Sequence, residues 1–222
     1  MKQGLDNETI ALRVAREFFD GAVVNLGIGI GGLAADFIPE GRTILFHTEN
    51  GLLGFGPHLR EDEMNQADVF LTDAQARFVK PAPGMSVFDH ATSFGMIRGG
   101  HIDISVLGAF QVSEHGDLAN WATREGKGVI GGGMDLAVGA KRLIVAMKHV
   151  TKTGELKIVR ECSYLLTGKE CVNLIVTDLA VIEVTEEGLL LKEIAPGWTV
   201  EEIQAVTEPK LKVATVLKPI EL

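Results

Sequence analysis

The chain has 222 residues, and 46% of them are hydrophobic, enough to bury a large core as one domain or as two closely packed domains. Its 30 acidic residues against 21 lysines and arginines give a net charge of -9, which opposes broad contact with the phosphates of DNA or RNA. The first 20 residues carry charges throughout and no apolar run approaches the roughly 18 residues of a membrane span, so we expect a cytoplasmic protein without a signal peptide.

Apolar runs separated by glycine clusters and amphipathic stretches predict an α/β architecture. The first helix is expected to start at the cap residue Asn7, to continue to about Phe19 and to stop at residues 20–21. Next we expect strands 22–26, 43–47, 69–72 and 102–107, helices 33–38 and 93–97, and an irregular segment at 73–87.

A second glycine-rich loop, residues 126–133, leads into a helical stretch, so its free backbone N–H groups should face whatever occupies the loop mouth. Beyond it we expect helix 134–140, strands 143–147, 174–176, 180–184 and 189–194, and a last helix 200–206. Thr199 and Glu202 form a capping box for that helix. Cys162 and Cys171 lack a metal-ligand spacing, so they are expected to be reduced core thiols, with no metal site.

A single carboxylate, Glu49, follows the expected strand 43–47, at the edge where open α/β sheets place their ligands. The loop after it contains Gly51, Gly54 and Gly56, which suit positive-φ turns and the close approach of a bulky ligand. Glu49 is therefore the first candidate for a functional residue.

Gly27, Gly29 and Gly32 match the dinucleotide-binding fingerprint G-x-G-x-x-G, and Glu49 follows about twenty residues later, where a ribose-binding acid would stand. This pattern favours an NAD-dependent oxidoreductase. No hydride-transfer partner follows, and the glycine loop after Glu49 fits a larger ligand. A ligand-binding or regulatory module that has lost its chemistry is a third, non-enzymatic hypothesis.

Several motifs in one order resemble the B subunit of the family I CoA-transferases, which act on 3-oxo acids such as acetoacetate and 3-oxoadipate or on short fatty acids. The likeness runs from about Ile10 to Val206. The motifs are 25–29 (NLGIG), 48–57 (TENGLLGFGP), 97–101 (IRGGH), 107–112 (LGAFQV), 116–121 (GDLANW), 131–136 (GGGMDL) and 177–181 (TDLAV).

The resemblance implies an open three-layer α/β/α fold with a mostly parallel sheet, formed by residues 1–222 as a single B-type domain. It also implies a separate A subunit, with two copies of each kind of chain in the enzyme. No permanently bound cofactor is implied, because coenzyme A is both substrate and covalent intermediate in this family.

The resemblance further implies that Glu49 is the nucleophile, with the amide of Asn25 and the backbone N–H of Gly132 stabilising the oxyanion. The residues implied in binding coenzyme A are Asn50, Gly51, Gly54, Gly131 and Gly133. Three other polar residues, Arg98, His101 and Asp103, are interpreted as fixing loops.

This sequence departs from the family pattern near the expected site. Thr48 stands where a serine is most common, which keeps the hydroxyl. Residues 71–75 replace an Asn-Ala-Gly-Lys segment and lack its lysine, which leaves the identity of the acyl group open.

Overall fold

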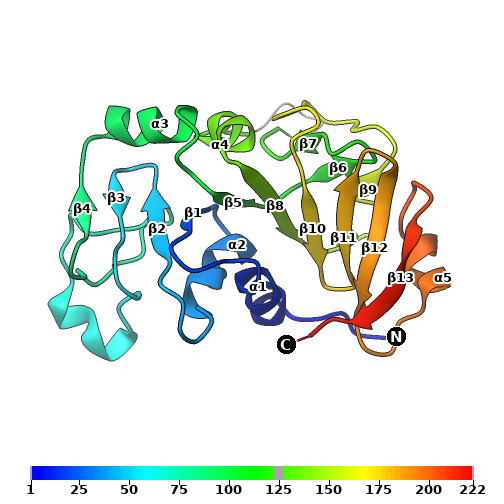
Figure 1. Cartoon of the computed structure of the whole chain (residues 1–222), viewed down its shortest axis with the longest axis horizontal. Helices are drawn as coiled ribbons and strands as arrows, with labels where there is room; N and C mark the ends of the chain where they lie inside the picture. Colours follow the sequence, from blue (N-terminus) through cyan, green and yellow to red (C-terminus); the bar gives the residue numbers. More distant parts are fainter. Residues whose placement is uncertain (1, 123–127, 222) are drawn as a thin grey trace.

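The computed structural model describes residues 2–122 and 128–221, and a ten-stranded sheet forms its centre (Figure 1). In spatial order the strands are β13 (Lys212–Pro219), β12 (Gly188–Ile194), β11 (Ala180–Thr185), β10 (Leu174–Thr177), β8 (Arg142–Met147), β5 (Ile104–Leu107), β1 (Val23–Leu26), β2 (Leu45–Thr48), β3 (Leu52–Leu53) and β4 (Ser86–Val87). The five strands from β10 to β2 are parallel throughout, and antiparallel pairs extend the sheet on both sides.

A separate three-stranded sheet has the order β7 (Leu118–Ala119), β6 (Gln111–Ser113) and β9 (Ile158–Val159). The helices are α1 (Asn7–Ala15), α2 (Ile30–Leu33), α3 (His90–Arg98), α4 (Gly133–Gly139) and α5 (Val200–Ala205), with 3-10 turns at Ala34–Asp36 and Glu61–Gln66. None of the helices in the described part of the chain is long and apolar enough to cross a membrane.

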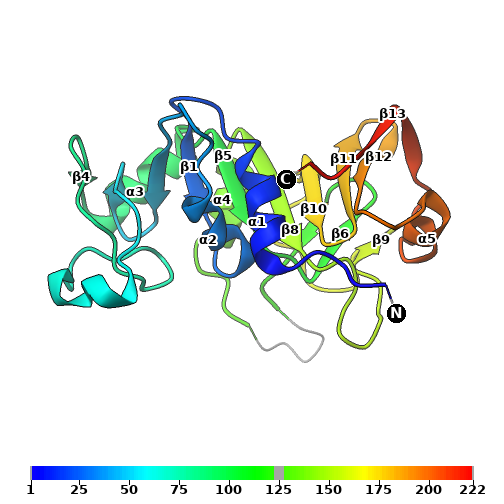
Figure 2. The same cartoon turned by 90° about the horizontal axis from the view of Figure 1, so that it is seen from below.

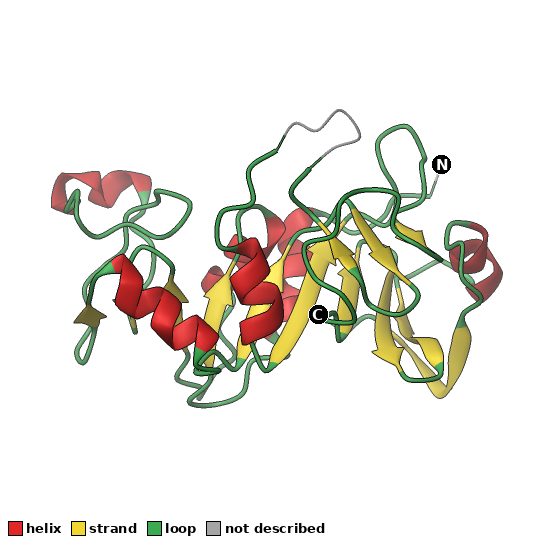
Figure 3. Cartoon of the chain, turned by 90° about the horizontal axis from the view of Figure 1, so that it is seen from above, coloured by secondary structure: helices red, strands yellow, loops and turns green. Residues whose placement is uncertain are grey.

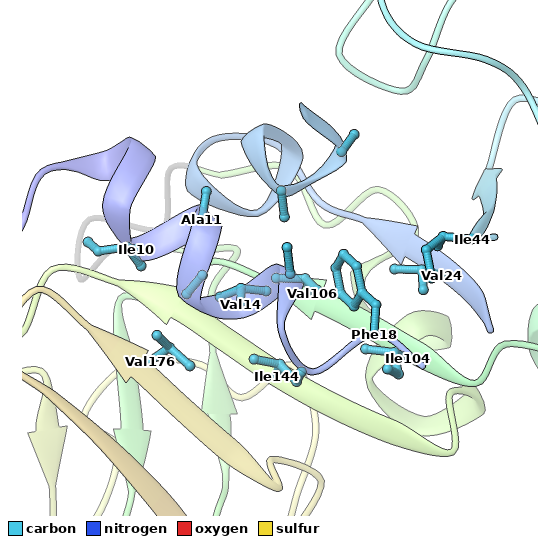
Figure 4. Close-up of a cluster of buried hydrophobic side chains, with 14 of the residues drawn as sticks. Ile10, Ala11, Val14, Phe18, Val24, Ile44, Ile104, Val106, Ile144 and Val176 are labelled. Atoms are coloured by element: carbon cyan, nitrogen blue, oxygen red, sulfur yellow. The ribbon is translucent and has the colours of Figure 1, made fainter. Parts of the chain in front are cut away.

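Two apolar cores cover the two faces of the large sheet, because side chains alternate along each strand. Ile144 of β8 faces the core beneath α1 and α2 (Figure 4), and Ala146 belongs to the same core, whereas Leu143 and Val145 face the core beneath α3 and α4. Figure 2 shows α1 and α2 on the near side of the strands, and Figure 3 gives the opposite view. The expected three-layer α/β/α fold with a mostly parallel sheet is confirmed.

The first helix differs from its prediction at both ends. Asp6, not Asn7, is the cap, because its side chain accepts a 2.7 Å hydrogen bond from the N–H of Thr9. The helix ends at Ala15 because the next bonds tighten to i→i-3, from Glu17 to Val14 and from Phe18 to Ala15. Phe18 still reaches the core, where its ring meets that of Phe46 edge-on at 6.2 Å.

Most other predicted elements are confirmed within a few residues, including β8, β10, β11, β12, α3, α4 and α5 with its capping box. The helix predicted at 33–38 begins instead at Ile30 and tightens into a 3-10 turn, and the predicted strand at 69–72 is wrong. That segment is a loop in which Thr72 makes one isolated bridge to Phe78. Of the predicted glycine loop 126–133, residues 126 and 127 lie outside the described residues.

The topology brings several loops to one edge of the sheet. Strand β1 lies between β2 and β5 and is parallel to both, with Asn25 beside His47 and Ser105. The carboxyl ends of these strands therefore meet at the same edge, and the chain leaves β1 and β5 in opposite directions along the sheet. Such a switch point is where open α/β sheets bind ligands.

Candidate active site

Glu49 follows β2 directly and lies between two cavities at this edge. It is half-buried, and both cavities are also lined by Ala74, Gly131 and Gly132. The first cavity, of about 790 Å³, continues along Asn50, His90, Phe94, Arg98 and Asp135. The second, of about 570 Å³, continues along Ile28, Gly108, Phe110, Asn120, Val129 and Gly133. Glu49 thus lines two adjoining cavities.

Gly132 touches the Glu49 side chain. A Cβ atom at residue 132 would lie 3.2 Å from Cγ of Glu49 and 3.1 Å from Cζ of Phe94, so a larger residue would push on both. Within the described residues, the N–H groups of Gly131 and Gly132 make no hydrogen bond. The loop next to the Glu49 side chain therefore contains backbone donors without a hydrogen bond within the described residues, the kind of group that an oxyanion site uses.

Burial and nearby groups act on the ionisation of Glu49 in opposite directions. Burial raises the pKa of Glu49, while its own backbone N–H and the charge of His90 act in the opposite direction. No ion pair to Glu49 forms among residues 2–122 and 128–221. A carboxylate that no cation neutralises keeps its electron density available for attack.

A buried hydrogen-bond network holds the residue before Glu49. His47 bridges Asn25 and Ser93, with 3.0 Å from its Nδ1 to Asn25 Nδ2 and 3.0 Å from its Nε2 to Ser93 Oγ, and Ser93 donates to the carbonyl of Thr48 at 2.9 Å. Because that carbonyl can only accept, the Ser93 hydrogen goes there, His47 Nε2 donates to Ser93, and Nδ1 accepts from Asn25. Burial lowers the pKa of His47 to about 4, in agreement with this neutral form.

The structure separates the predicted site residues into two groups. Glu49, Asn50 and the three glycines 131–133 line the cavities. Asn25 lines neither, because its side chain is 1% exposed and bound to His47. Gly51 and Gly54 shape the loop instead: Gly51 has φ 111°, and a Cβ there would lie 2.0 Å from the carbonyl oxygen of Phe88.

Helix α3 contributes to the first cavity in a way that was not predicted from the sequence. Arg98, interpreted as a loop-fixing residue, does pair with Asp135 at 2.7 Å, but it also lines the cavity together with His90 and Phe94. The four-residue spacing of these three side chains was the available signal, but the predicted helix 93–97 contains only Phe94, whereas α3 extends from His90 to Arg98. Asp103 is structural as expected, since it binds the N–H of Val23 and the ammonium of Lys141.

The glycine fingerprint after β1 is covered by the chain itself. The N–H of Gly29 donates to Gln75 Oε1 at 3.0 Å, and a Cβ at Gly32 would lie 1.6 Å from Gln75 Nε2. Asp73 holds this covering loop by accepting hydrogen bonds from the N–H groups of Gln75 and Arg77. The side chain of Gln75 thus occupies the place where a dinucleotide would set its pyrophosphate, which counts against the oxidoreductase hypothesis.

The two cysteines lie outside the chemistry of the site. Cys162 and Cys171 are free and half-buried, and burial raises their thiol pKa values to about 12 and about 11, so neither is a nucleophile at neutral pH. In the part of the chain that the structure describes, no three His, Cys, Asp or Glu side chains gather as metal ligands would.

Comparison with known proteins finds relatives whose sequences match this chain over more than nine-tenths of its length. The B subunit of the 3-oxoadipate CoA-transferase of Acinetobacter baylyi is 46% identical over 213 residues, which cover 95% of this chain and 97% of that protein. The B subunit of a probable succinyl-CoA:3-ketoacid coenzyme A transferase of Bacillus subtilis is 46% identical over 91% of this chain and 93% of its own.

Among solved structures, the acyl-CoA transferase YdiF of Escherichia coli O157:H7 superposes with a TM-score of 0.77 at 20% identity. It matches all of this chain, which spans only 44% of that longer protein, and at this identity the likeness concerns the fold. The family model of coenzyme A transferases matches residues 7–205. With that match and these relatives, the chain belongs to the coenzyme A transferase family.

Proposed function

We propose that this chain is the subunit of a CoA-transferase that carries the catalytic glutamate, and that Glu49 is that residue. The observation that supports the proposal is a half-buried carboxylate without an ion pair, in contact with Gly132 and open to two cavities. The substrates are an acyl-CoA, such as succinyl-CoA or acetyl-CoA, and a 3-oxo or short-chain carboxylic acid.

The reaction proceeds through covalent steps at the side-chain carboxyl group of Glu49. The carboxylate attacks the thioester carbonyl, the C–S bond breaks, and an acyl-glutamyl anhydride and the CoA thiolate form. The thiolate then attacks the glutamyl carbonyl, which releases the first carboxylic acid and leaves a Glu49–CoA thioester. The second acid reverses the sequence, and coenzyme A serves as substrate and intermediate without being a resident cofactor.

Each tetrahedral intermediate carries an oxyanion, for which the free N–H of Gly132 is the proposed donor. Contacts to coenzyme A are proposed for Asn50, Gly131 and Gly133, which line the cavities, whereas Gly51 and Gly54 shape the loop after Glu49. For Asn25 the geometry supports an indirect role: its amide reaches Glu49 through His47, Ser93 and the Thr48 carbonyl, and not by contact with substrate.

The names of the relatives support a second kind of chain in the enzyme. Both relatives are named as B subunits, and the longer YdiF chain extends well beyond the matched part. Around the Glu49 cavities this chain exposes Ile28 (73%) and Val129 (90%), apolar side chains that a partner would cover. We therefore propose that residues 1–222 act as one domain in a complex of two A and two B subunits, located in the cytoplasm.

The covalent intermediate provides the test. With the A subunit and succinyl-CoA present and no acceptor acid, intact-mass analysis should show coenzyme A joined to this chain, and peptide mapping should place it on Glu49. Glu49→Gln keeps the size but removes the nucleophile, so it should fold, bind coenzyme A and form no adduct. Glu201→Gln, an exposed glutamate of α5, is the matched control and should react normally. Turnover without any adduct on the wild-type chain would refute the proposal.

A further inference from the structure

Helix α3 presents one stripe of side chains to the first cavity. His90, Phe94 and Arg98 are spaced four residues apart and all line it together with Glu49. Phe94 is the centre of the stripe: its ring lies 4.5 Å from that of His90, and the Arg98 guanidinium carbon lies 5.5 Å from its centroid. Phe94 also approaches Gly132, so the stripe lies close to the nucleophile.

Both ends of the stripe have unused hydrogen-bond donors. Arg98 binds Asp135 through Nε, and its two terminal nitrogens make no hydrogen bond within residues 2–122 and 128–221. The His90 ring makes none within the same residues either. Both side chains are exposed in the isolated chain, 67% in the case of Arg98, so a ligand in the cavity can reach them.

The cavity gathers anions that need compensation. Glu49 and Asp135 are its acidic lining residues, the whole chain has a net charge of -9, and the proposed substrates are acids. A second carboxylate placed near Glu49 would be repelled unless a cation or strong donor received it. Among the described residues that line this cavity, His90 and Arg98 are the two with basic side chains.

We propose that His90 and Arg98 form a subsite for the distal carboxylate of a dicarboxylic acyl group, while its other carboxyl carbon reacts at Glu49. This inference rests on the proposed transferase function and adds to it the residues that select a dicarboxylic over a monocarboxylic acyl group, with Phe94 supporting the methylene chain. The phosphates of coenzyme A could use the same donors, but the pantetheine arm keeps them far from the reacting sulfur, whereas this stripe lies beside Glu49.

Two thioesters that differ only in a distal carboxylate test the subsite. Succinyl-CoA and butyryl-CoA have acyl chains of equal length, and the rate of CoA adduct formation on Glu49 is measured for each in the complex with the A subunit. His90→Gln should lower the ratio of the succinyl to the butyryl rate by about ten- to a hundredfold, the usual effect of one hydrogen bond to a charged group. Arg98→Gln should lower the ratio in the same direction.

His101→Gln is the matched control, because His101 is an exposed histidine just beyond the same helix and outside the cavity lining. It should leave the ratio unchanged. If His90→Gln and Arg98→Gln form the adduct with an unaltered ratio, the subsite is refuted while the transferase function stands. Equal losses with both thioesters would also refute it and assign the donors to coenzyme A. No adduct with the wild-type complex would refute the transferase function itself.

Discussion

At the scale of single residues, close packing and hydrogen bonds restrict the position of Glu49 in the candidate site. Beside Gly132 there is no room for a Cβ atom without displacing Glu49 or Phe94, and Ser93 joins His47 to the carbonyl just before Glu49. Both arrangements fix where the carboxylate points. Orientation of this kind contributes to catalysis because a small displacement of a reacting group lowers the rate steeply.

Gly132→Ala should lower turnover by about ten- to a hundredfold, because the new methyl group would displace Glu49 by a few tenths of an ångström. The fold should survive, since residue 132 has φ -83°, which alanine adopts readily. Gly95→Ala is the control: an added Cβ there meets nothing within 4 Å, so turnover should not change. Steady-state kinetics of the assembled enzyme measures both, and wild-type turnover of Gly132→Ala would contradict the proposed contact.

Ser93→Ala should lower both stability and turnover. It removes the bridge between His47 and Thr48, and an unsatisfied buried group costs about 1–3 kcal/mol of unfolding free energy. Thr207→Ala is closely matched, because Thr207 Oγ1 also joins a buried histidine, His149, to a backbone carbonyl, that of Ile203. In denaturant unfolding the two variants should lose similar stability. Only Ser93→Ala should lose turnover; equal turnover losses would show that the Ser93 bridge is merely structural.

Glu49→Gln should be more stable than the wild type at neutral pH. Burial raises the pKa of Glu49 above its ordinary 4.5, so the folded chain favours the neutral acid. Stability present below 4.5 is therefore lost as the pH rises through the raised pKa, and glutamine avoids this loss. Thermal melts should show a higher Tm for the variant at pH 7 and converging values as the pH falls below 4.5. A Tm gap that widens toward low pH would contradict this.

At the scale of elements, the loop between β3 and β4 supports the whole site edge. Asp73 is 7% exposed and binds Arg77, His58 and two backbone N–H groups, and the loop it holds covers the β1 glycines and presents Ala74 to both cavities. Although burial opposes ionisation, the His58 and Arg77 bonds lower the pKa of Asp73 to about 2. Its stabilisation is present above 3.8 and is lost as the pH falls toward 2.

Asp73→Ala should lower the unfolding free energy at pH 7 by about 3–5 kcal/mol, because it leaves buried partners without their anion. Asp68→Ala is the control in the same loop: Asp68 is exposed and accepts one hydrogen bond from the N–H of Phe70. It should cost well under half as much. Urea unfolding compares the two, and equal losses would mean that the Asp73 pairs add nothing.

Local sequence patterns predict individual helices and strands better than they predict which helices and strands contact one another. The β2 strand and Glu49 after it were predictable, because a β-branched run followed by glycines fixes both. The eight-residue β13 was not, because its exposed Lys212, Thr215 and Lys218 hide the strand pattern. The strand predicted at 69–72 was wrong because Val69 and Phe70 are apolar, as in a buried strand, yet are 72% and 84% exposed in a loop.

The candidate site shows the same division. Glu49 and Gly132 follow from loops whose glycines are visible in the sequence. The orientation of the Asn25 side chain does not follow from the sequence. Its partner His47 is 22 residues away, and only the pairing of β1 with β2 brings the two together. His90 and Arg98 join the site because α3 packs against α4, a contact between elements that no local pattern encodes.

At the scale of the whole molecule, the candidate active site lies at the carboxyl ends of the central strands and is exposed to solvent in this chain. We expect the isolated chain to have no transferase activity and the complex with the A subunit to be active, because the cavities around Glu49 lie in solvent in the chain alone. Co-expression, size measurement by light scattering and an assay of each fraction would show it. Full activity in a fraction that contains only this chain would contradict the expectation.

The lateral edge at β13 has a consequence for association between molecules. An open sheet offers unpaired backbone groups along its last strand, which can recruit strands from other chains. Here Lys212 and Lys218 put positive charge on that strand, Pro219 lacks an N–H, and the register with β12 shifts between Leu191 and Glu193. These features make a poor template for a further strand. We therefore expect this edge to resist the addition of strands from other chains, and we expect Lys212→Val together with Lys218→Val to increase fibrillar aggregation, measured by thioflavin T fluorescence.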